Sequence, residues 1–583
     1  MKIVLRVIKE AIRYKWYLVI AACSTLMLTA ISLIMPRLMS EMTAMVARGI
    51  DDAGMRQITF LAIGLLVFSA SRILFRFLSN YMAHKAAWKL VEEMRIKVYC
   101  KLQGLSIGYF RNHESGDLVS RIINDTASFE QLYAHLLPES VTNIITMTGV
   151  TIILFTVNAR LALLTCLPIP FILISGYILS KVIRPNFRKM HKFQGKLSAQ
   201  LQDNFSGIQE IQAFGQQDTA TRRVEEKASG LTVSMLRALR ANAVFHPTVE
   251  FLTGLGTVIV VGFGGYFAYR NQMQVEDIVA FLLYLALFYA PVTGLSQLLE
   301  SLQQALAGVE RVIEVLDAPE VISDQPNAAP LENIRGELIF ENVSFHYNED
   351  TPVLNDVSFK AEPGQMIALV GATGVGKSTM AQLIDRFYDP VSGVIRIDGM
   401  DLRDVQLNSL RRNVAVVLQD TFLFNGTIAE NIAFACPEAS FEEVEKASKA
   451  ARIHDDILRM TDGYDTMVGE RGAKLSGGQK QRISIARAIL CSAPVLILDE
   501  ATASVDVQTE ANIQQAIAEL TGTRTIVAIA HRLSTVRRAD CILVLQDGRI
   551  IQRGTHEELI QCDGLYRDMS CIQEQAAMLV ETM

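Results

Sequence analysis

Six long apolar stretches constrain the fold of this chain more than any other feature of its sequence. Each is long enough to cross the hydrocarbon core of a bilayer, which takes about 20 helical residues. The predicted spans are residues 16–38, 58–80, 137–157, 161–183, 247–269 and 278–299. The chain has 583 residues, 50% of them apolar. Because this length exceeds what one hydrophobic core holds, we expect a membrane domain joined to a soluble one.

Lysine and arginine gather in alternate connections between these spans, and this bias predicts their orientation. Basic residues mark the cytoplasmic side of a membrane protein. The amino-terminal arm and residues 81–136 and 184–246 are therefore expected inside, and the shorter, less basic connections outside. The two long inner connections lack the Pro, Gly and Ser enrichment of disordered loops. We expect the membrane helices to continue into the cytoplasm and turn at tips near residues 106–116 and 207–217.

The first residues predict a helix on the membrane surface. Lys2, Arg6, Lys9 and Arg13 share one face of a helix whose opposite face is apolar, a pattern typical of binding to anionic lipid. The alternative is a cleaved signal peptide. The following apolar run is long enough to span and has no small-residue cleavage site, which favours the surface helix.

Composition excludes several other classes of protein. The net charge is -6, and no basic block interleaved with aromatic residues suggests a nucleic-acid partner. The 8 cysteines have no paired spacing and no accompanying histidines, so neither a zinc site nor a disulfide framework is indicated. The soluble part is expected in a reducing cytoplasm.

A proline-interrupted polar stretch predicts the boundary between the two parts. We expect an all-α, six-helix transmembrane domain at residues 1–318, including the surface helix, a linker at 319–336 and an α/β domain at 337–583. In this last region, strand-like apolar runs alternate with helical patterns. The chain is thus predicted to be multidomain.

A glycine-rich loop carries the sharpest chemical signal. Gly371-Ala-Thr-Gly-Val-Gly-Lys-Ser follows an apolar strand and precedes a helical stretch that begins near Thr379. Glycines allow backbone N–H groups to close around phosphate oxygens, Lys377 adds positive charge, and Ser378 offers a hydroxyl to magnesium. The alternative, a chance glycine turn, does not explain the strand and helix on either side. The motif predicts an α/β P-loop nucleotide-binding domain.

A second apolar strand, residues 495–498, delivers Asp499 and Glu500 side by side at its end. Such a pair is by itself often a solvated turn. Beside a phosphate loop it fits a magnesium–nucleotide site, where Asp499 holds the metal through water and Glu500 polarises the attacking water.

Leu475-Ser-Gly-Gly-Gln, together with these two motifs, closely resembles the signature of ATP-binding cassette proteins. The other residues that mark this family appear in the expected order along the chain. Tyr347 resembles the aromatic that stacks on adenine, Gln419 the glutamine that senses magnesium and the membrane domain, Asp506 the interface aspartate, and His531 the switch histidine. Individually, Tyr347 also fits an edge-strand aromatic and His531 a core histidine.

The resemblance implies that ATP and Mg²⁺ are bound, and that a second chain completes the site. Catalysis is assigned to Glu500, His531 and Lys377, and the metal to Ser378, Gln419 and Asp499. The residues expected to bind nucleotide are Tyr347, Gly371, Gly374, Gly376, Lys377, Ser378, Thr379, Gln419, Ser476, Gly478, Gln479, Asp499 and Asp506. Ser476 and the glycines after it lie before a helical stretch and form an anion site at its positive end.

Six spans ahead of one cassette are similar to the exporter-type (type IV) half-transporters of this family. The resemblance implies an ATP-hydrolysing translocase that works as a homodimer or heterodimer and moves a small-molecule, lipid or peptide-like substrate by alternating access. Alternatives are an exporter-shaped importer of metal chelates and an ATP-gated channel or receptor. Intact Glu500 and His531 favour turnover. A multi-pass protein of the bacterial plasma membrane, with a cytoplasmic cassette, is expected.

Three charged residues within or beside the spans are candidates for substrate contact. Arg72 and Arg76 lie late in the second span, where charge is costly unless it reaches the interface, pairs or lines water. We expect Arg76 to snorkel and leave open a contact of Arg72 with an anionic substrate or lipid headgroup. Glu250 is a comparable outlier. The 21 methionines need no explanation beyond packing.

Overall fold

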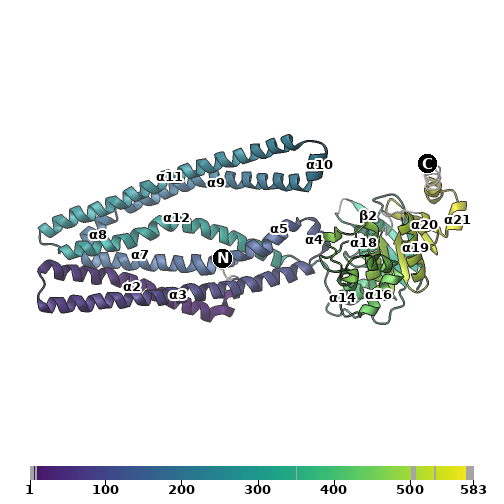
Figure 1. Ribbon diagram of the computed structural model, residues 1–583, viewed down its shortest axis with the longest axis horizontal. Helices are drawn as coiled ribbons and strands as arrows, with labels where there is room; N and C mark the ends of the chain where they lie inside the picture. The colour runs from purple at the N-terminus through teal and green to yellow at the C-terminus, as the bar shows by residue number, and fades with distance from the viewer. Residues whose placement is uncertain (1–5, 7–8, 349–350, 500–506, 531–532, 573–583) are drawn as a thin grey trace. The chain divides into compact units, whose positions relative to one another are not determined.

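The computed structural model describes residue 6 and residues 9–348, 351–499, 507–530 and 533–572. The chain forms two compact units, coloured by residue number in Figure 1. Unit 1 comprises Met1–Gln103 and His113–Ala318, and unit 2 comprises Gly104–Asn112 and Pro319–Met583. A short segment from the first third of the chain thus belongs to the unit that otherwise begins at Pro319.

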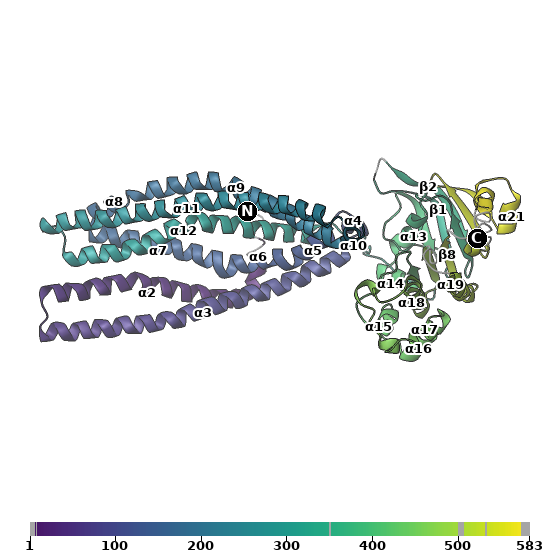
Figure 2. The same ribbon diagram turned by 45° about the horizontal axis from the view of Figure 1, so that its top comes forward.

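The described part of unit 1 consists of helices joined by short connections, and its long helices lie side by side in both views (Figure 2). Its elements are η1 (Ile12–Tyr14), α2 (Lys15–Arg48), α3 (Asp52–Gly104), α5 (Ser115–Ser120), η2 (Arg121–Asp125), α6 (Thr126–Glu130), η3 (Gln131–Leu136), α7 (Leu137–Val157), α8 (Ala159–Thr165), α9 (Pro168–Ser206), α10 (Ile208–Ala213), α11 (Gln217–Tyr269) and α12 (Val275–Asp317). η2 and η3 are π-helical turns. α12 packs against α2, α7 and α11 and so occupies the middle of the unit.

Six helical stretches of the described part are long and apolar enough to cross a membrane, as the sequence predicted. The third predicted span, residues 137–157, coincides with α7. The second, fifth and sixth spans belong to α3, α11 and α12, which run on well beyond them. α10 lies at the second predicted tip, between the ends of α9 and α11.

The fourth predicted span is not one continuous helix. α8 ends at Thr165 and α9 begins at Pro168. Proline lacks the N–H that would continue the helical ladder, and its ring clashes with the carbonyl of residue i−4. The break therefore falls directly before Pro168, and residues 159–178 as a whole are still long and apolar enough to cross a membrane, as the sequence predicted.

Two residues of the basic amino-terminal face have partners within unit 1. Arg6 pairs with Asp317 at 2.5 Å, and Arg13 pairs with Glu93 on α3. Lys97 on α3 contacts Glu10 at 2.7 Å. This arm is therefore held to the protein by ion pairs, which the sequence pattern alone did not indicate.

Unit 2 contains α4 (Ile107–Arg111) and two β-sheets. An antiparallel sheet has the order β2-β1-β4-β5, and a six-stranded sheet has the order β10-β9-β3-β8-β7-β6. The strands are β1 (Leu338–His346), β2 (Pro352–Ala361), β3 (Met366–Val370), β4 (Ser392–Ile397), β5 (Met400–Asp401), β6 (Val414–Val417), β7 (Val495–Asp499), β8 (Thr525–Ile529), β9 (Cys541–Gln546) and β10 (Arg549–Gly554). The helices are α13 (Lys377–Ile384), η4 (Leu402–Asp404), α14 (Leu407–Asn413), α15 (Ile428–Ala433), α16 (Phe441–Ala450), α17 (His454–Leu458), η5 (Gly463–Asp465), η6 (Glu470–Gly472), α18 (Gly477–Leu490), α19 (Val507–Leu520), α20 (Leu533–Val536) and α21 (His556–Gln561).

The six-stranded sheet is buried on both faces, which explains why its parallel strands are continuously apolar. Alternate residues of β3 enter different cores: Ala368 packs with α18, whereas Ile367 packs with α13 and the antiparallel sheet. The phosphate-loop helix α13 and the signature helix α18 consequently pack against opposite faces of one sheet.

Candidate nucleotide-binding site

The candidate site lies where neighbouring parallel strands end. β3, β8, β7 and β6 are adjacent and parallel, so their carboxyl ends meet at one edge of the sheet. In open α/β sheets this edge is where ligands bind. The glycine loop follows β3, Asp499 ends β7, and Gln419 comes two residues after β6.

The glycines of the loop adopt conformations that other residues rarely reach. Gly371, Gly374 and Gly376 have φ values of 153°, 87° and 105°. A Cβ on Gly371 would lie 2.4 Å from the carbonyl oxygen of Leu545, and one on Gly376 would lie 2.6 Å from a methyl carbon of Leu354. The sequence needs glycine here for both backbone conformation and space. Gly374, with nothing within 4 Å, needs it for conformation alone.

Lys377, the first residue of α13, is 5% exposed, and its ammonium group lies inside the loop. Its Nζ donates hydrogen bonds to the carbonyl oxygens of Gly371 at 2.8 Å and Ala372 at 2.9 Å. Ser378 is exposed and Thr379 is buried. A buried cation at the positive end of α13, within a ring of backbone groups, fits the phosphate chain of a nucleotide.

Tyr347, one residue past β1, is tied to the phosphate-loop helix. Its hydroxyl lies 3.1 Å from Oγ1 of Thr379 and donates to Oε1 of Gln382 at 2.9 Å. The side chains of Phe345 and Tyr388 meet its ring nearly at right angles. An aromatic ring held beside the loop in this way fits the predicted stacking on adenine.

Arg111 at the end of α4 also reaches this tyrosine, a contact that no sequence motif indicates. Its guanidinium lies 5.4 Å from the centre of the Tyr347 ring. Beside it, the backbone of Gly108 approaches Tyr388 closely enough that a Cβ would lie 3.7 Å from the ring. The segment Gly104–Asn112 is thus seated on the aromatic cluster of the candidate site.

Strand register places the acidic end of β7 beside the loop. Asp499 is level with Ile529 of β8, and Ile529 is level with Leu369 of β3. Two strand spacings separate Asp499 from β3, which is about 10 Å. Gln419 leaves the adjacent strand β6 at the same edge. This spacing leaves room for a metal ion between the loop hydroxyl and the carboxylate, and the oxygen ligands suit Mg²⁺.

The signature motif forms the first turn of α18, where the sequence placed it. Ser476 caps the helix: its hydroxyl accepts from the Gln479 N–H at 3.3 Å, while the Gln479 side chain accepts from the Ser476 N–H at 3.0 Å. This capping box leaves the N–H groups of Gly477 and Gly478 and the hydroxyl hydrogen of Ser476 available to an anion.

A buried asparagine fixes the loop after Gln419. Asn431 on α15 is 1% exposed. Its side chain exchanges hydrogen bonds of 2.9 Å with the backbone of Phe424, and also donates to the carbonyl of Thr427. Arg487 of α18 donates to the backbone oxygen of Asn431 at 2.8 Å, and burial lowers the pKa of this guanidinium. The loop and the signature helix therefore form one hydrogen-bonded structure.

Three predicted site residues, Glu500, Asp506 and His531, lie outside the described residues. Their roles stay predictions. Asp499 and Ile529, which precede the first and last of them on β7 and β8, end at the loop-bearing edge.

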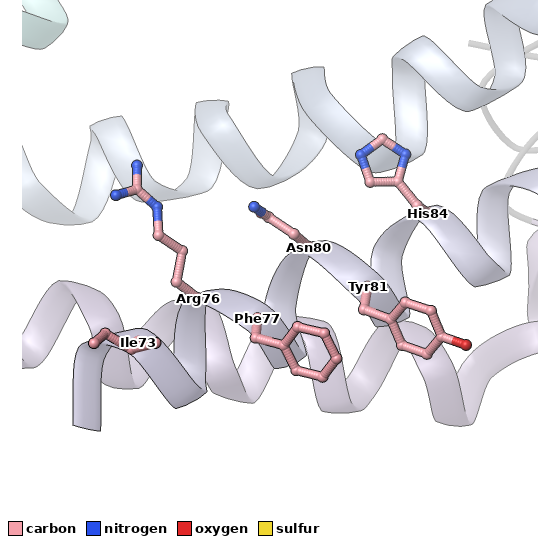
Figure 3. Close-up of a pocket in the computed structure, with 6 residues that line it drawn as sticks. All are labelled: Ile73, Arg76, Phe77, Asn80, Tyr81 and His84. Atoms are coloured by element: carbon pink, nitrogen blue, oxygen red, sulfur yellow. The ribbon is translucent and has the colours of Figure 1, made fainter. Parts of the chain in front are cut away.

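Within unit 1, the charged residues of the second span lie on α3. Arg72 donates to the sulfur of Met35 at 3.7 Å and is exposed. Arg76 lines a shallow, largely open surface cavity of about 510 Å³ on α3, together with Ile73, Phe77, Asn80, Tyr81 and His84 (Figure 3). Glu250 on α11 is exposed.

Comparisons with known proteins match both units. The family model described as "ABC transporter transmembrane region" matches residues 18–292, and the one described as "ABC transporter" matches residues 354–503. A fatty acid ABC transporter ATP-binding/permease protein of Mycobacterium bovis is 38% identical over 534 residues, covering 91% of this chain and 84% of that protein. YknV of Bacillus subtilis, an uncharacterized ABC transporter ATP-binding protein, is 37% identical over 553 residues, covering 94% and 91%. The solved structure of a bacterial Atm1-family ABC exporter with ATP bound aligns with a TM-score of 0.84 and 30% identity over 96% of this chain and 98% of that one.

Proposed function

This chain belongs to the ABC transporter family as an exporter-type half-transporter that couples ATP hydrolysis to transport, and from this premise we propose that it works as a homodimeric exporter of amphiphilic molecules. Every chain carries one phosphate loop and one signature turn. Two copies are therefore sufficient to build two complete sites.

The observation that supports a dimer is that α13 and α18 pack against opposite faces of the six-stranded sheet. An anion-binding turn on α18 serves a nucleotide held by a second copy: Ser476 and Gly478 bind its terminal phosphate from the side opposite Lys377. Closure of two such sites buries both nucleotides between the chains.

The residues of each site have different roles. Lys377 and the loop N–H groups bind the phosphates, and Tyr347 stacks on the base. Ser378, Gln419 and Asp499 would hold Mg²⁺, and the bound metal would neutralise charge that develops on the phosphate oxygens. Glu500 orients the attacking water and accepts its proton, while His531 contacts the terminal phosphate. Asp506 is assigned by the family resemblance to the contact between the chains.

The cavity on α3 supports an amphiphilic substrate with an anionic group. Phe77 and Tyr81 stack with ring centroids 5.6 Å apart, and Arg76 and Asn80 project from another side of the same helix (Figure 3). An apolar chain fits against the rings while an anionic head meets the guanidinium. The name of the mycobacterial relative, a fatty acid transporter, is consistent with this chemistry. The bacterial origin of the relatives supports the plasma membrane as its location.

The decisive experiment uses the chain expressed alone and reconstituted in lipid vesicles. We expect ATPase activity that Glu500→Gln abolishes, together with ATP-dependent movement of a labelled fatty acid away from the face that carries unit 2. An inactive single chain would overturn the homodimer. Movement toward unit 2 would favour an importer, and flux without proportional ATP hydrolysis would favour a channel.

A further inference from the structure

Two histidines and a glutamate from separate helical segments of unit 1 converge beside the α3 cavity. His84 lies on α3, Glu130 ends α6, and His135 lies in the π-helical turn η3. Nδ1 of His84 is 2.9 Å from Oε1 of Glu130, and Nε2 of His135 is 3.4 Å from the same oxygen. The three ligand atoms all lie within 4.8 Å of one another, the one such group of histidine, cysteine and acidic residues found in the described part of the chain.

We propose that these three side chains form a binding site for a divalent transition metal of the zinc class. In a tetrahedral zinc site with bonds of about 2.0–2.1 Å, neighbouring ligand atoms are about 3.3–3.4 Å apart. The two distances to Glu130 lie within about half an ångström of that spacing, and the nitrogens of the two histidines lie within 4.8 Å of each other. Small side-chain rotations complete the geometry and leave the fourth position to water. Two imidazole nitrogens favour zinc over the oxygen-seeking Mg²⁺ and Ca²⁺.

The π-helical turn is what brings two of the ligands together. In an α-helix, residues five apart lie about 140° apart around the axis and face different neighbours. A π-helix bonds residue i to i+5, so Glu130 and His135 lie one above the other. Such turns occur frequently at functional sites. A simple histidine–carboxylate contact does not need this departure from the α-helix, because His84 and Glu130 already meet without it.

The three residues are accessible enough to exchange a metal. The side chain of Glu130 is 18% exposed, that of His84 38% and that of His135 56%. The two imidazole rings lie 4.9 Å apart at 74°, so their nitrogens approach the carboxylate from different directions. His84 also lines the cavity, and Asn80, one turn earlier, projects from the same side of α3 (Figure 3).

A bound metal would fasten the inner extension of the second span to the helix that leads into the third. α3 also contacts this helix where Arg95 donates to the carbonyl of Ile123 at 3.2 Å and to Oγ1 of Thr126 at 3.3 Å. The metal site adds a further attachment, three turns away along α3. This role is independent of the nucleotide site and of the transported substrate.

The test is Zn²⁺ binding to the full-length protein, purified in lipid nanodiscs with an affinity tag that contains no histidine. Equilibrium dialysis against a chelator of known affinity gives the dissociation constant, and elemental analysis gives the stoichiometry. We expect one Zn²⁺ per chain, bound more than about tenfold more weakly in each of His84→Ala, Glu130→Gln and His135→Ala. His113→Ala and the double variant Cys436→Ser/Cys491→Ser are matched controls and keep the wild-type affinity.

A gain of signal protects the test against variants that only disturb folding. Cysteine is also a zinc ligand, so His84→Cys is expected to retain binding, and its Co²⁺ form should show a thiolate-to-metal absorption band that the wild type lacks. The proposal is overturned if wild-type protein binds no more Zn²⁺ than the triple variant, if the cysteine controls abolish binding, or if the Co²⁺ form of His84→Cys shows no thiolate band.

Discussion

The guanidinium of Arg111 lies over the ring of Tyr347, 5.4 Å from its centre. Arg111 belongs to a helix of five residues that is followed along the chain by membrane-spanning helices, whereas Tyr347 is the proposed adenine contact. The contact therefore links the orientation of a ligand-binding ring to a segment that continues into unit 1.

Removing this contact is expected to weaken ATP binding without slowing hydrolysis. A cation–π contact at an exposed position is worth about 0.5–1 kcal/mol, so Arg111→Ala should raise the KM for ATP about two- to fivefold and leave kcat unchanged. Tyr347→Ala should have the larger effect, and the double variant should be no worse than Tyr347→Ala alone. Arg412→Ala, a change at an exposed arginine of α14, is the control. Additive effects of the two substitutions would contradict this coupling.

Asn431 offers a test of the loop after Gln419. Replacing it by alanine leaves the backbone groups of Phe424 and Thr427 without their partner, and each unsatisfied buried group costs about 1–3 kcal/mol. We expect a lower urea midpoint for unit 2 in pulse proteolysis and a reduced ATPase rate. Asn425→Ala, six residues earlier and exposed, should change neither. Unchanged stability of the Asn431 variant would show that the loop does not depend on these bonds.

Asp385 predicts a dependence of stability on pH. Burial raises the pKa of this carboxyl from its ordinary value near 3.8 to about 7, although Arg411 partly offsets the effect. Between these values the folded chain keeps a proton that the unfolded chain has lost. Stability from this group is therefore fully present below pH 4 and declines as the pH rises toward 7. Asp385→Asn should remove the decline and stabilise unit 2 at pH 8, by at most about 4 kcal/mol at 1.36 kcal/mol per pKa unit.

The measurement is the urea midpoint of unit 2 at pH 5 and pH 8 in both proteins. The exposed Asp568→Asn is the control and should follow the wild type. If Asp385→Asn lost as much stability as the wild type on going to pH 8, the assignment of the decline to Asp385 would fail.

Gly256 predicts a close contact between helices within the membrane unit. An added Cβ would lie 2.2 Å from the hydroxyl oxygen of Tyr289, and that hydroxyl donates to the carbonyl of Thr165 at 3.0 Å. Gly256→Ala should therefore force α11 and α12 apart and cost about 1–3 kcal/mol. Gly262→Ala on the same helix, where nothing lies within 4 Å, should be neutral or slightly stabilising. The measurement is the thermal unfolding midpoint of each purified variant in detergent, which only Gly256→Ala should lower.

The spans and the strand-end motifs were readable from the sequence because each depends on local pattern. α7 coincides with its predicted window, and the signature turn starts α18 as expected. The break before Pro168 follows from the proline itself, while the apolar window around it still predicted the span. The helix on the carboxyl side of this break, α9, continues to Ser206.

Other parts of the site depend on contacts between segments far apart in the chain. Nothing around Arg111 indicates that it would meet Tyr347, and nothing around Asn431 indicates its hydrogen bonds to Phe424 and Thr427. The metal candidates were missed for a different reason. His84, Glu130 and His135 have no ligand spacing in sequence, because a π-helical turn rather than an α-helix places two of them together.

The assignment of Gly104–Asn112 to unit 2 has a consequence for how this family can exchange parts. If a cassette were transferred to another such protein by joining the chains only near Pro319, it would lose the segment Gly104–Asn112, which packs on its surface. Arg111 and Gly108 are in that segment, while Tyr347 and Tyr388 are in the cassette. Recombination that keeps unit 2 whole must transfer both Gly104–Asn112 and the sequence from Pro319 onward. We therefore expect these two segments to be inherited together.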